Sequence, residues 1–157
     1  MDWQALFLSA DGRIGRKDFW IGALILMVAW LLAPVFHLLA PIVWLLLLYP
    51  WVCVFSKRLH DFGRSGFLIV VPFLVGAVAV ALGLAFGGAA ALGSLWAAAF
   101  GGAVSWAMVI GGLGVMAGFL ALAGVAKVIF ILWVGLSPSD PGPNLYGPPT
   151  QALIPQP

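Results

Sequence analysis

The sequence predicts an all-α, polytopic membrane protein, and three observations lead to this fold class. First, 64% of the 157 residues are hydrophobic and only 8% are charged, whereas soluble domains have about 25% charged residues. Second, no Asp, Glu, Lys or Arg occurs from 19 to 56, and Lys127 is the only one between 67 and 139. Third, prolines and glycines divide these runs into lengths near the roughly 20 residues that one spanning helix needs. This composition excludes an ordinary soluble enzyme, a disordered tail and a basic nucleic-acid-binding module.

We expect a cytoplasmic N-terminal segment over residues 1–18. Its apolar residues recur at helical spacing at Trp3, Leu6, Phe7 and Ala10. This pattern predicts either a short helix that lies on the membrane surface and ends at 11–12, or an unstructured leader. The basic residues follow the apolar stretch, so the segment is not a cleavable signal peptide.

Residues 19–57 are predicted to form a hairpin of two spans, near 19–36 and 41–57. The apolar run is too long for one span, and two prolines flank its middle. Pro41 suits the first turn of the second helix, where its missing N–H costs nothing. His37 is expected in the turn, solvated at the outer surface.

The second apolar run, residues 67–136, would extend about 105 Å as one helix and must therefore fold back. Glycine clusters at 87–88, 101–102 and 111–114 divide it most evenly into spans near 67–86, 91–111 and 115–135. This gives about five spans in a transmembrane domain of 19–136; four spans is the alternative. Lys127 would lie about 13 Å from the end of the last span, and we expect it to snorkel or to mark a helix boundary.

Two weaker patterns concern helix contacts and depth. Gly83/Gly87 and Gly114/Gly118 have the small-xxx-small spacing that lets helices approach closely. Trp20, Tyr49 and Trp51 suggest an aromatic belt near the cytoplasmic face.

The distribution of charge predicts the orientation. Six of the seven basic residues fall in 13–17 and 57–64, which lie on the same side if the first run is a hairpin. Because basic residues near span ends stay in the cytoplasm, we expect both the N-terminus and the loop 58–66 there. The tail 137–157 holds seven of the eleven prolines and is expected to be extended and largely unpacked. The tail would lie outside with five spans and inside with four.

Three motifs stand in a recognisable order: Gly12-Arg-Ile-Gly-Arg-Lys-Asp-Phe-Trp20, Lys57-Arg-Leu-His-Asp-Phe-Gly-Arg-Ser-Gly66 and Pro141-Gly-Pro-Asn-Leu-Tyr-Gly147. Their order and spacing resemble the DUF805 family of bacterial inner-membrane proteins. The chain departs from the family pattern at Asp18, Lys57 and Phe67, and by an Ala/Gly-rich stretch at 87–115 that looks like an inserted helical hairpin. The resemblance implies a small multi-pass protein of the bacterial plasma (inner) membrane without an established activity.

The candidate site residues lie in these motifs. For an anionic lipid or a partner they are Arg13, Arg16, Lys17, Lys57, Arg58, His60, Asp61 and Arg64, and in the tail Gly142, Asn144, Tyr146 and Gly147. The alternative for Asp61 is a local bond to Arg58 or Arg64 that shapes the turn. His60 and Asp61 would point about 100° apart on a helix and are not expected to form an acid–base pair. Gly63 is expected to end the second span and Ser65 to cap the next helix, and 142–147 is a candidate for a compact turn.

No paired carboxylates, metal-binding motif or nucleotide-binding loop occurs in the sequence. We therefore expect a non-enzymatic structural or interaction protein without cofactor, metal or nucleic acid. Its basic cytoplasmic face would meet membrane lipids, a protein partner or a second copy. One alternative is a small-solute transporter or channel that acts as a homo-oligomer, with Lys127 as its intramembrane charge. Another is a membrane enzyme with His60 and Asp61 at the interface.

Overall fold

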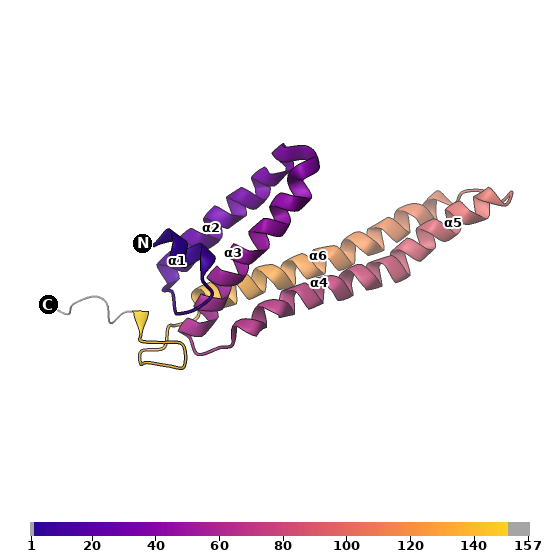
Figure 1. Cartoon of the computed structure of the whole chain (residues 1–157). Coiled ribbons are helices and arrows are strands. Elements are labelled where there is room, and N and C mark those ends of the chain that lie inside the picture. Colours follow the sequence, from indigo (N-terminus) through magenta and orange to yellow (C-terminus); the bar gives the residue numbers. More distant parts are fainter. Residues whose placement is uncertain (1, 151–157) are drawn as a thin grey trace. The chain divides into compact units, whose positions relative to one another are not determined.

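The computed structural model describes residues 2–150, and every regular element within them is helical (Figure 1). The chain divides into two compact units. Unit 1 contains the described residues up to Ile69 and those from Leu132 onward, and unit 2 is Val70–Ile131.

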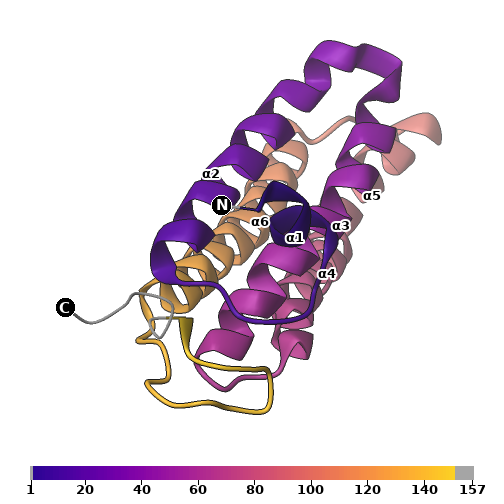
Figure 2. The same ribbon diagram turned by 60° about the vertical axis from the view of Figure 1, so that its left-hand side comes forward.

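Unit 1 is built on a helical hairpin, as the sequence predicts. Helix α2 (Arg16–Leu32) continues through a 3-10 segment η1 (Ala33–Leu39) into α3 (Ala40–Asp61). The chain reverses at exposed His37, whose φ of 49° is uncommon for a residue with a side chain. Pro41 lies in the first turn of α3. Figure 2 shows α2 and α3 side by side below this reversal.

Aromatic and small side chains pack the two arms of this hairpin together. Phe19 of α2 meets Phe55 of α3 edge to face, with ring centroids 5.0 Å apart. Nearer the reversal, Trp44 stacks on Trp30 at 5.5 Å and donates its Nε1–H to the Trp30 carbonyl at 3.1 Å. Most other large side chains on α2 and α3 stay exposed, which is how an apolar hairpin that faces lipid differs from one that faces water.

A short helix, α1 (Trp3–Leu8), precedes the hairpin, so the structure has the helix and not the unstructured leader. The Asp2 side chain caps it by accepting from the Ala5 N–H at 3.1 Å. The helix ends at Leu8, before the 11–12 boundary expected from the sequence. Buried Leu6 packs against α3 and against Gly22 of α2, where an added Cβ would touch Leu6 and Val54 at 3.4 Å.

The second apolar run folds back once, not twice. A 3-10 turn η2 (Gly66–Ile69), α4 (Val70–Leu82), a π-helical turn η3 (Gly83–Gly88) and α5 (Ala89–Ala99) form one continuous helical stretch. Residues 100–105 make the turn, and α6 (Trp106–Leu136) runs back beside this stretch (Figure 1). Only the last turn of α6, from Leu132, belongs to unit 1.

The expected span at 91–111 is therefore wrong, because the turn at 100–105 lies in its middle. The glycine clusters at 87–88 and 111–114 do not break helices. Instead, Gly87 and Gly112 lie against each other, and a Cβ on either would come within about 2.3 Å of the other's carbonyl oxygen. Here glycine marks a close crossing between two helices.

Three helical stretches are long and apolar enough to cross a membrane: Arg16–Asp61, Gly66–Ala99 and Trp106–Leu136. The first contains the reversal at residue 37, so it provides the two arms α2 and α3. The all-helical class is confirmed, and the count of five spans is not.

Candidate functional site

The end of α3 is shaped by two small residues. Gly63 has φ +71° and follows the last helical turn, where its N–H donates to the His60 carbonyl at 3.1 Å and the Arg64 N–H donates to the Leu59 carbonyl at 2.9 Å. This is the left-handed helix end that the sequence predicts. Ser65 then accepts from the Phe67 N–H at 3.3 Å and starts η2. The loop thereby holds Asp61 at the terminus of α3, turned inward and fully buried.

Asp61 is the centre of a buried network. One carboxylate oxygen accepts from Arg13 Nε at 3.3 Å and from the Thr150 hydroxyl at 3.0 Å. The other accepts from Arg58 and from the Ser139 hydroxyl. We call Arg13, Arg58 and Asp61, together with the tail residues bonded to them, the polar cluster. These tail residues are Ser137, Ser139, Asp140, Gly142, Gly147 and Thr150.

Arg13 joins the N-terminal segment to both α3 and the tail. Its Nη2 donates to the Asp61 carbonyl at 3.0 Å and to the Asp140 carbonyl at 2.8 Å. Its Nη1 donates to the Gly142 carbonyl at 2.9 Å and to the Gly147 carbonyl at 3.3 Å. Only 2% of the Arg13 side chain is exposed. Its N–H groups therefore donate to acceptors within the protein.

Arg58 joins α3 to the end of α6. It is fully buried, and its Nε donates to the Val134 carbonyl at 3.2 Å while its Nη2 donates to the Ser137 carbonyl. The salt bridge to Asp61, three residues later, is the local bond that the sequence offers as an alternative to a ligand site. A charge buried this way is tolerated because it is paired and hydrogen-bonded.

Residues 137–150 of the tail are bonded to the rest of unit 1, which corrects the expectation of a largely unpacked segment; residues 151–157 lie outside the described residues. The expected compact turn is present at 142–147, closed by paired backbone bonds of 3.1 Å between Asn144 and Gly147. The Asn144 side chain donates to the His60 carbonyl at 2.9 Å. Proline prevents a regular helix here, as expected, but it leaves backbone carbonyls free to accept from the two arginines.

Tyr146 and His60 face each other across this turn. Their rings stack with centroids 3.7 Å apart and planes 2° from parallel. His60 Nδ1 lies 3.3 Å from the Gly12 carbonyl oxygen. His60 therefore contacts the N-terminal segment through its ring and the tail through both its ring and its carbonyl.

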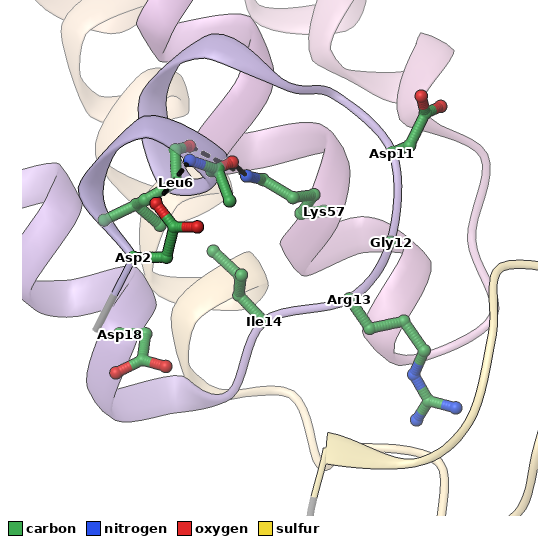
Figure 3. Close-up of a pocket in the computed structure, with 9 residues that line it drawn as sticks. Asp2, Leu6, Asp11, Gly12, Arg13, Ile14, Asp18 and Lys57 are labelled. Atoms are coloured by element: carbon green, nitrogen blue, oxygen red, sulfur yellow. Dashed lines mark hydrogen bonds between the residues drawn. The ribbon is translucent and has the colours of Figure 1, made fainter.

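Lys57 points toward α1. Its Nζ donates to the Leu6 carbonyl at 2.9 Å and to the Ala5 carbonyl. A cavity of about 220 Å³ adjoins it, and Figure 3 shows Asp2, Asp11 and Asp18 around the rim while Arg13 extends away.

The structure divides the eight candidate residues of the basic face into two groups. Arg13, Lys57, Arg58, His60 and Asp61 are turned into the protein. Arg16, Lys17 and Arg64 are exposed, although Arg16 also donates its Nε–H to the Ser137 carbonyl at 3.2 Å. All four tail residues lie in the turn beside the polar cluster, and the Gly142 and Gly147 carbonyls are acceptors for Arg13.

Sequence reasoning missed the tail residues that complete the network: Ser137, Ser139, Asp140 and Thr150. The available signal was the run Ser137-Pro-Ser-Asp140, which places polar side chains directly after an apolar helix. Backbone acceptors such as Val134 leave no signal in a sequence.

The arrangement binds the chain to itself. Within residues 2–150, every buried side-chain nitrogen or oxygen has a hydrogen-bond partner. In the same part of the chain, no group of three or more His, Cys, Asp or Glu is placed to hold a metal ion. The hydrogen bonds of the polar cluster connect segments 12–16, 57–63 and 134–150 to one another.

Comparisons with known proteins agree with the three motifs. A family model described as "Protein of unknown function (DUF805)" matches residues 7–148. The uncharacterized protein YiiR of Escherichia coli strain K12 is 36% identical over 85 residues, which covers 48% of this chain and 58% of that protein. YiiR of Escherichia coli O157:H7 matches with the same identity and coverage. This chain thus spans little more than half the length of these curated relatives, and no solved structure matches. Because the family model covers most of the chain, including all three motifs, the protein belongs to the DUF805 family.

Proposed function

We propose that this protein is a non-enzymatic, multi-pass protein of the bacterial inner membrane with both ends on the cytoplasmic side. Its exposed cations would bind the headgroups of anionic lipids. The observation that supports this topology is the polar cluster, in which the segment before α2, the end of α3 and the segment after α6 bond to one another. Three segments that share buried hydrogen bonds share a membrane surface, so the number of crossings between them is even.

The cytoplasmic assignment is supported by the distribution of basic residues. Arg16 and Lys17 are the first two residues of α2, and Arg64 follows α3, so all three exposed cations of these segments flank the polar cluster. Basic residues near span ends are retained in the cytoplasm. Such residues also attract anionic lipids by about 1 kcal/mol each.

Reporter fusions at the C-terminus test the topology. We expect a green fluorescent protein fusion to fluoresce and an alkaline phosphatase fusion to be inactive, because these are the results for a C-terminus in the cytoplasm. An active phosphatase and a dark fluorescent protein would overturn the proposal, because the tail would then lie on the far side.

A triple variant, Arg16→Gln, Lys17→Gln and Arg64→Gln, tests lipid binding in the protein purified with its lipids. Native mass spectrometry should show several-fold less retained phosphatidylglycerol, with phosphatidylcholine unaffected. Lys127 lies within α6, away from the helix end, and its Nζ lies over the Phe73 ring at 6.0 Å. Lys127→Gln therefore serves as the control that retains the lipid. Equal retention by the triple variant and the control would contradict a headgroup site at these residues.

A further inference from the structure

We infer that residues 2–12 form a re-entrant segment, seated on α3 inside the cytoplasmic leaflet, with one face of α1 against the acyl chains of the lipid. The inference rests on the proposed topology, because it requires the polar cluster to lie at the cytoplasmic surface. It differs from the surface helix that the sequence suggests, since the contacts place α1 deeper than the cluster.

The depth of α1 follows from its contacts along α3. The Leu6 and Val54 side chains both lie 3.4 Å from the position that a Cβ on Gly22 would take. Val54 precedes Asp61 by seven residues, or about 10 Å of helix. The Tyr49 hydroxyl donates to the Leu8 carbonyl at 2.8 Å, which places that end of α1 toward a residue about 18 Å from Asp61 along the helix. The 22 residues of α3 rise only about 33 Å, little more than the roughly 30 Å hydrocarbon core. A segment beside residues 49–57 therefore lies within the membrane.

Most of the C-terminal backbone carbonyls of α1 have hydrogen-bond partners in the protein and do not need water. The last four carbonyls of a helix have no partner within it, and an unsatisfied carbonyl in hydrocarbon costs several kcal/mol. In α1, side chains of α3 bind three of these four carbonyls: Lys57 binds those of Ala5 and Leu6, and Tyr49 binds that of Leu8. Surface helices leave these groups to water and need no such partners.

The side chains of the segment separate by polarity. Trp3 and Phe7 stack with centroids 6.2 Å apart, and Trp3 and Leu8 are 49% and 60% exposed. Exposed apolar residues of α3, including Leu45 and Tyr49, extend the apolar surface of the hairpin on which α1 lies. Asp2 and Asp11 instead lie with Lys57 around one cavity (Figure 3). The charges are thus grouped around one cavity, and the large apolar side chains are left for lipid.

Lys57 is the positioning residue of this arrangement. It is only 3% exposed, and its ammonium group holds the C-terminal end of α1, where a helix carries partial negative charge. The sequence suggested Lys57 as a ligand for a lipid headgroup. In the structure Lys57 bonds within the protein, and in our inference the segment that it holds, residues 2–12, contacts the lipid.

Site-directed spin labelling of the full chain in phosphatidylglycerol-containing vesicles tests the inference. In a Cys53→Ala background, labels are placed at Leu8, at Leu45 as a lipid-facing reference and at Arg64 as an aqueous reference. We expect the Leu8 label to resemble Leu45, with high accessibility to oxygen and low accessibility to a water-soluble nickel complex. A Leu8 label resembling Arg64 would overturn the inference, and so would a label shielded from both probes, which would show a protein partner on this face.

Two substitutions test the anchor. Lys57→Met should raise the accessibility of the Leu8 label to the nickel complex several-fold, toward that of the Arg64 label. Tyr49→Phe, which removes one hydroxyl, should raise it by less. No change with either would overturn the role of these contacts. If the reporter fusions place the tail in the cytoplasm and Leu8 is nevertheless aqueous, the re-entrant segment fails while the proposed function stands.

Discussion

Asp61 accepts hydrogen bonds from two arginines that the protein buries almost completely. Asp61→Ala would leave both guanidinium groups without their carboxylate, and removing one partner of a buried ion pair costs about 3–5 kcal/mol. We therefore expect a loss of this size in the unfolding free energy, measured by denaturant titration in micelles. Asp18→Ala is the matched control: Asp18 lies in the first turn of α2, where a carboxylate contributes about 0.3–1 kcal/mol. Equal losses in the two variants would contradict the central place of Asp61.

The stacked pair of His60 and Tyr146 makes a second prediction. Tyr146→Ala removes the ring that covers His60, and aromatic pairs contribute about 0.5–1.5 kcal/mol beyond their buried area. The tail should then open more often, and limited proteolysis should cleave it several-fold faster. Tyr146→Phe keeps the ring and should be cleaved at the wild-type rate. Faster cleavage of the Phe variant would show that the hydroxyl, not the stack, holds the tail.

At the residue scale, features that depend on nearby residues could be predicted, and hydrogen-bond partners distant in the sequence could not. The helix end at Gly63 and the turn at 142–147 follow from backbone preferences that depend on a few neighbours. The Arg58–Asp61 bond follows from a three-residue spacing on a helix. Arg13 bonds to carbonyls more than 120 residues away, and no local pattern in the sequence indicates that pairing.

The crossing of η3 and α6 depends on two glycines that the backbone brings together. Gly87→Ala places a Cβ 2.2 Å from the Gly112 carbonyl oxygen, so the helices must separate and lose packing. We expect the variant to unfold at lower denaturant concentration, by an amount equivalent to about 1–3 kcal/mol. Gly114→Ala meets nothing within 4 Å and should be neutral or stabilising by up to about 1 kcal/mol, since alanine favours helix more than glycine. A stable Gly87→Ala variant would contradict the close crossing.

At the element scale, the glycine clusters show why the span count was difficult to predict. Glycine is used both to end helices and to let helices approach, and composition alone does not distinguish these uses. The spacing of Gly83 and Gly87 predicted a contact, and both residues lie against α6. Gly114 and Gly118 have the same spacing and open space around them. The actual turn uses Gly101, with φ +89°.

The second hairpin is longer than a bilayer is thick. Its first arm has 34 residues, or about 51 Å, compared with about 30 Å of hydrocarbon. We expect the turn at 100–105 to extend into water on the non-cytoplasmic side. In a Cys53→Ala background, Gly101→Cys should react fully with a membrane-impermeant maleimide added to intact cells, whereas Arg64→Cys should react only in inverted vesicles. An unreactive Gly101→Cys would show that the turn stays within the membrane.

For the whole molecule, the sequence predicted the fold class because lipid as a solvent constrains composition so strongly. The long uncharged runs required helices that reverse, and the first hairpin has the expected arms. The even return of the chain did not follow from hydropathy. The even number of crossings that we propose rests on hydrogen bonds from Arg13 and Arg58 to residues after α6.

The polar cluster also imposes an order on biosynthesis. A ribosome delivers Arg13, Arg58 and Asp61 long before it delivers their hydrogen-bond partners at 134–150, so the nascent hairpin carries its charges without most of their final partners. Folding of unit 1 is therefore completed only when the last part of the described chain emerges. A translation product truncated after α6 would keep these charges incompletely bonded, and membrane quality-control proteases would have a means of distinguishing it from a finished molecule.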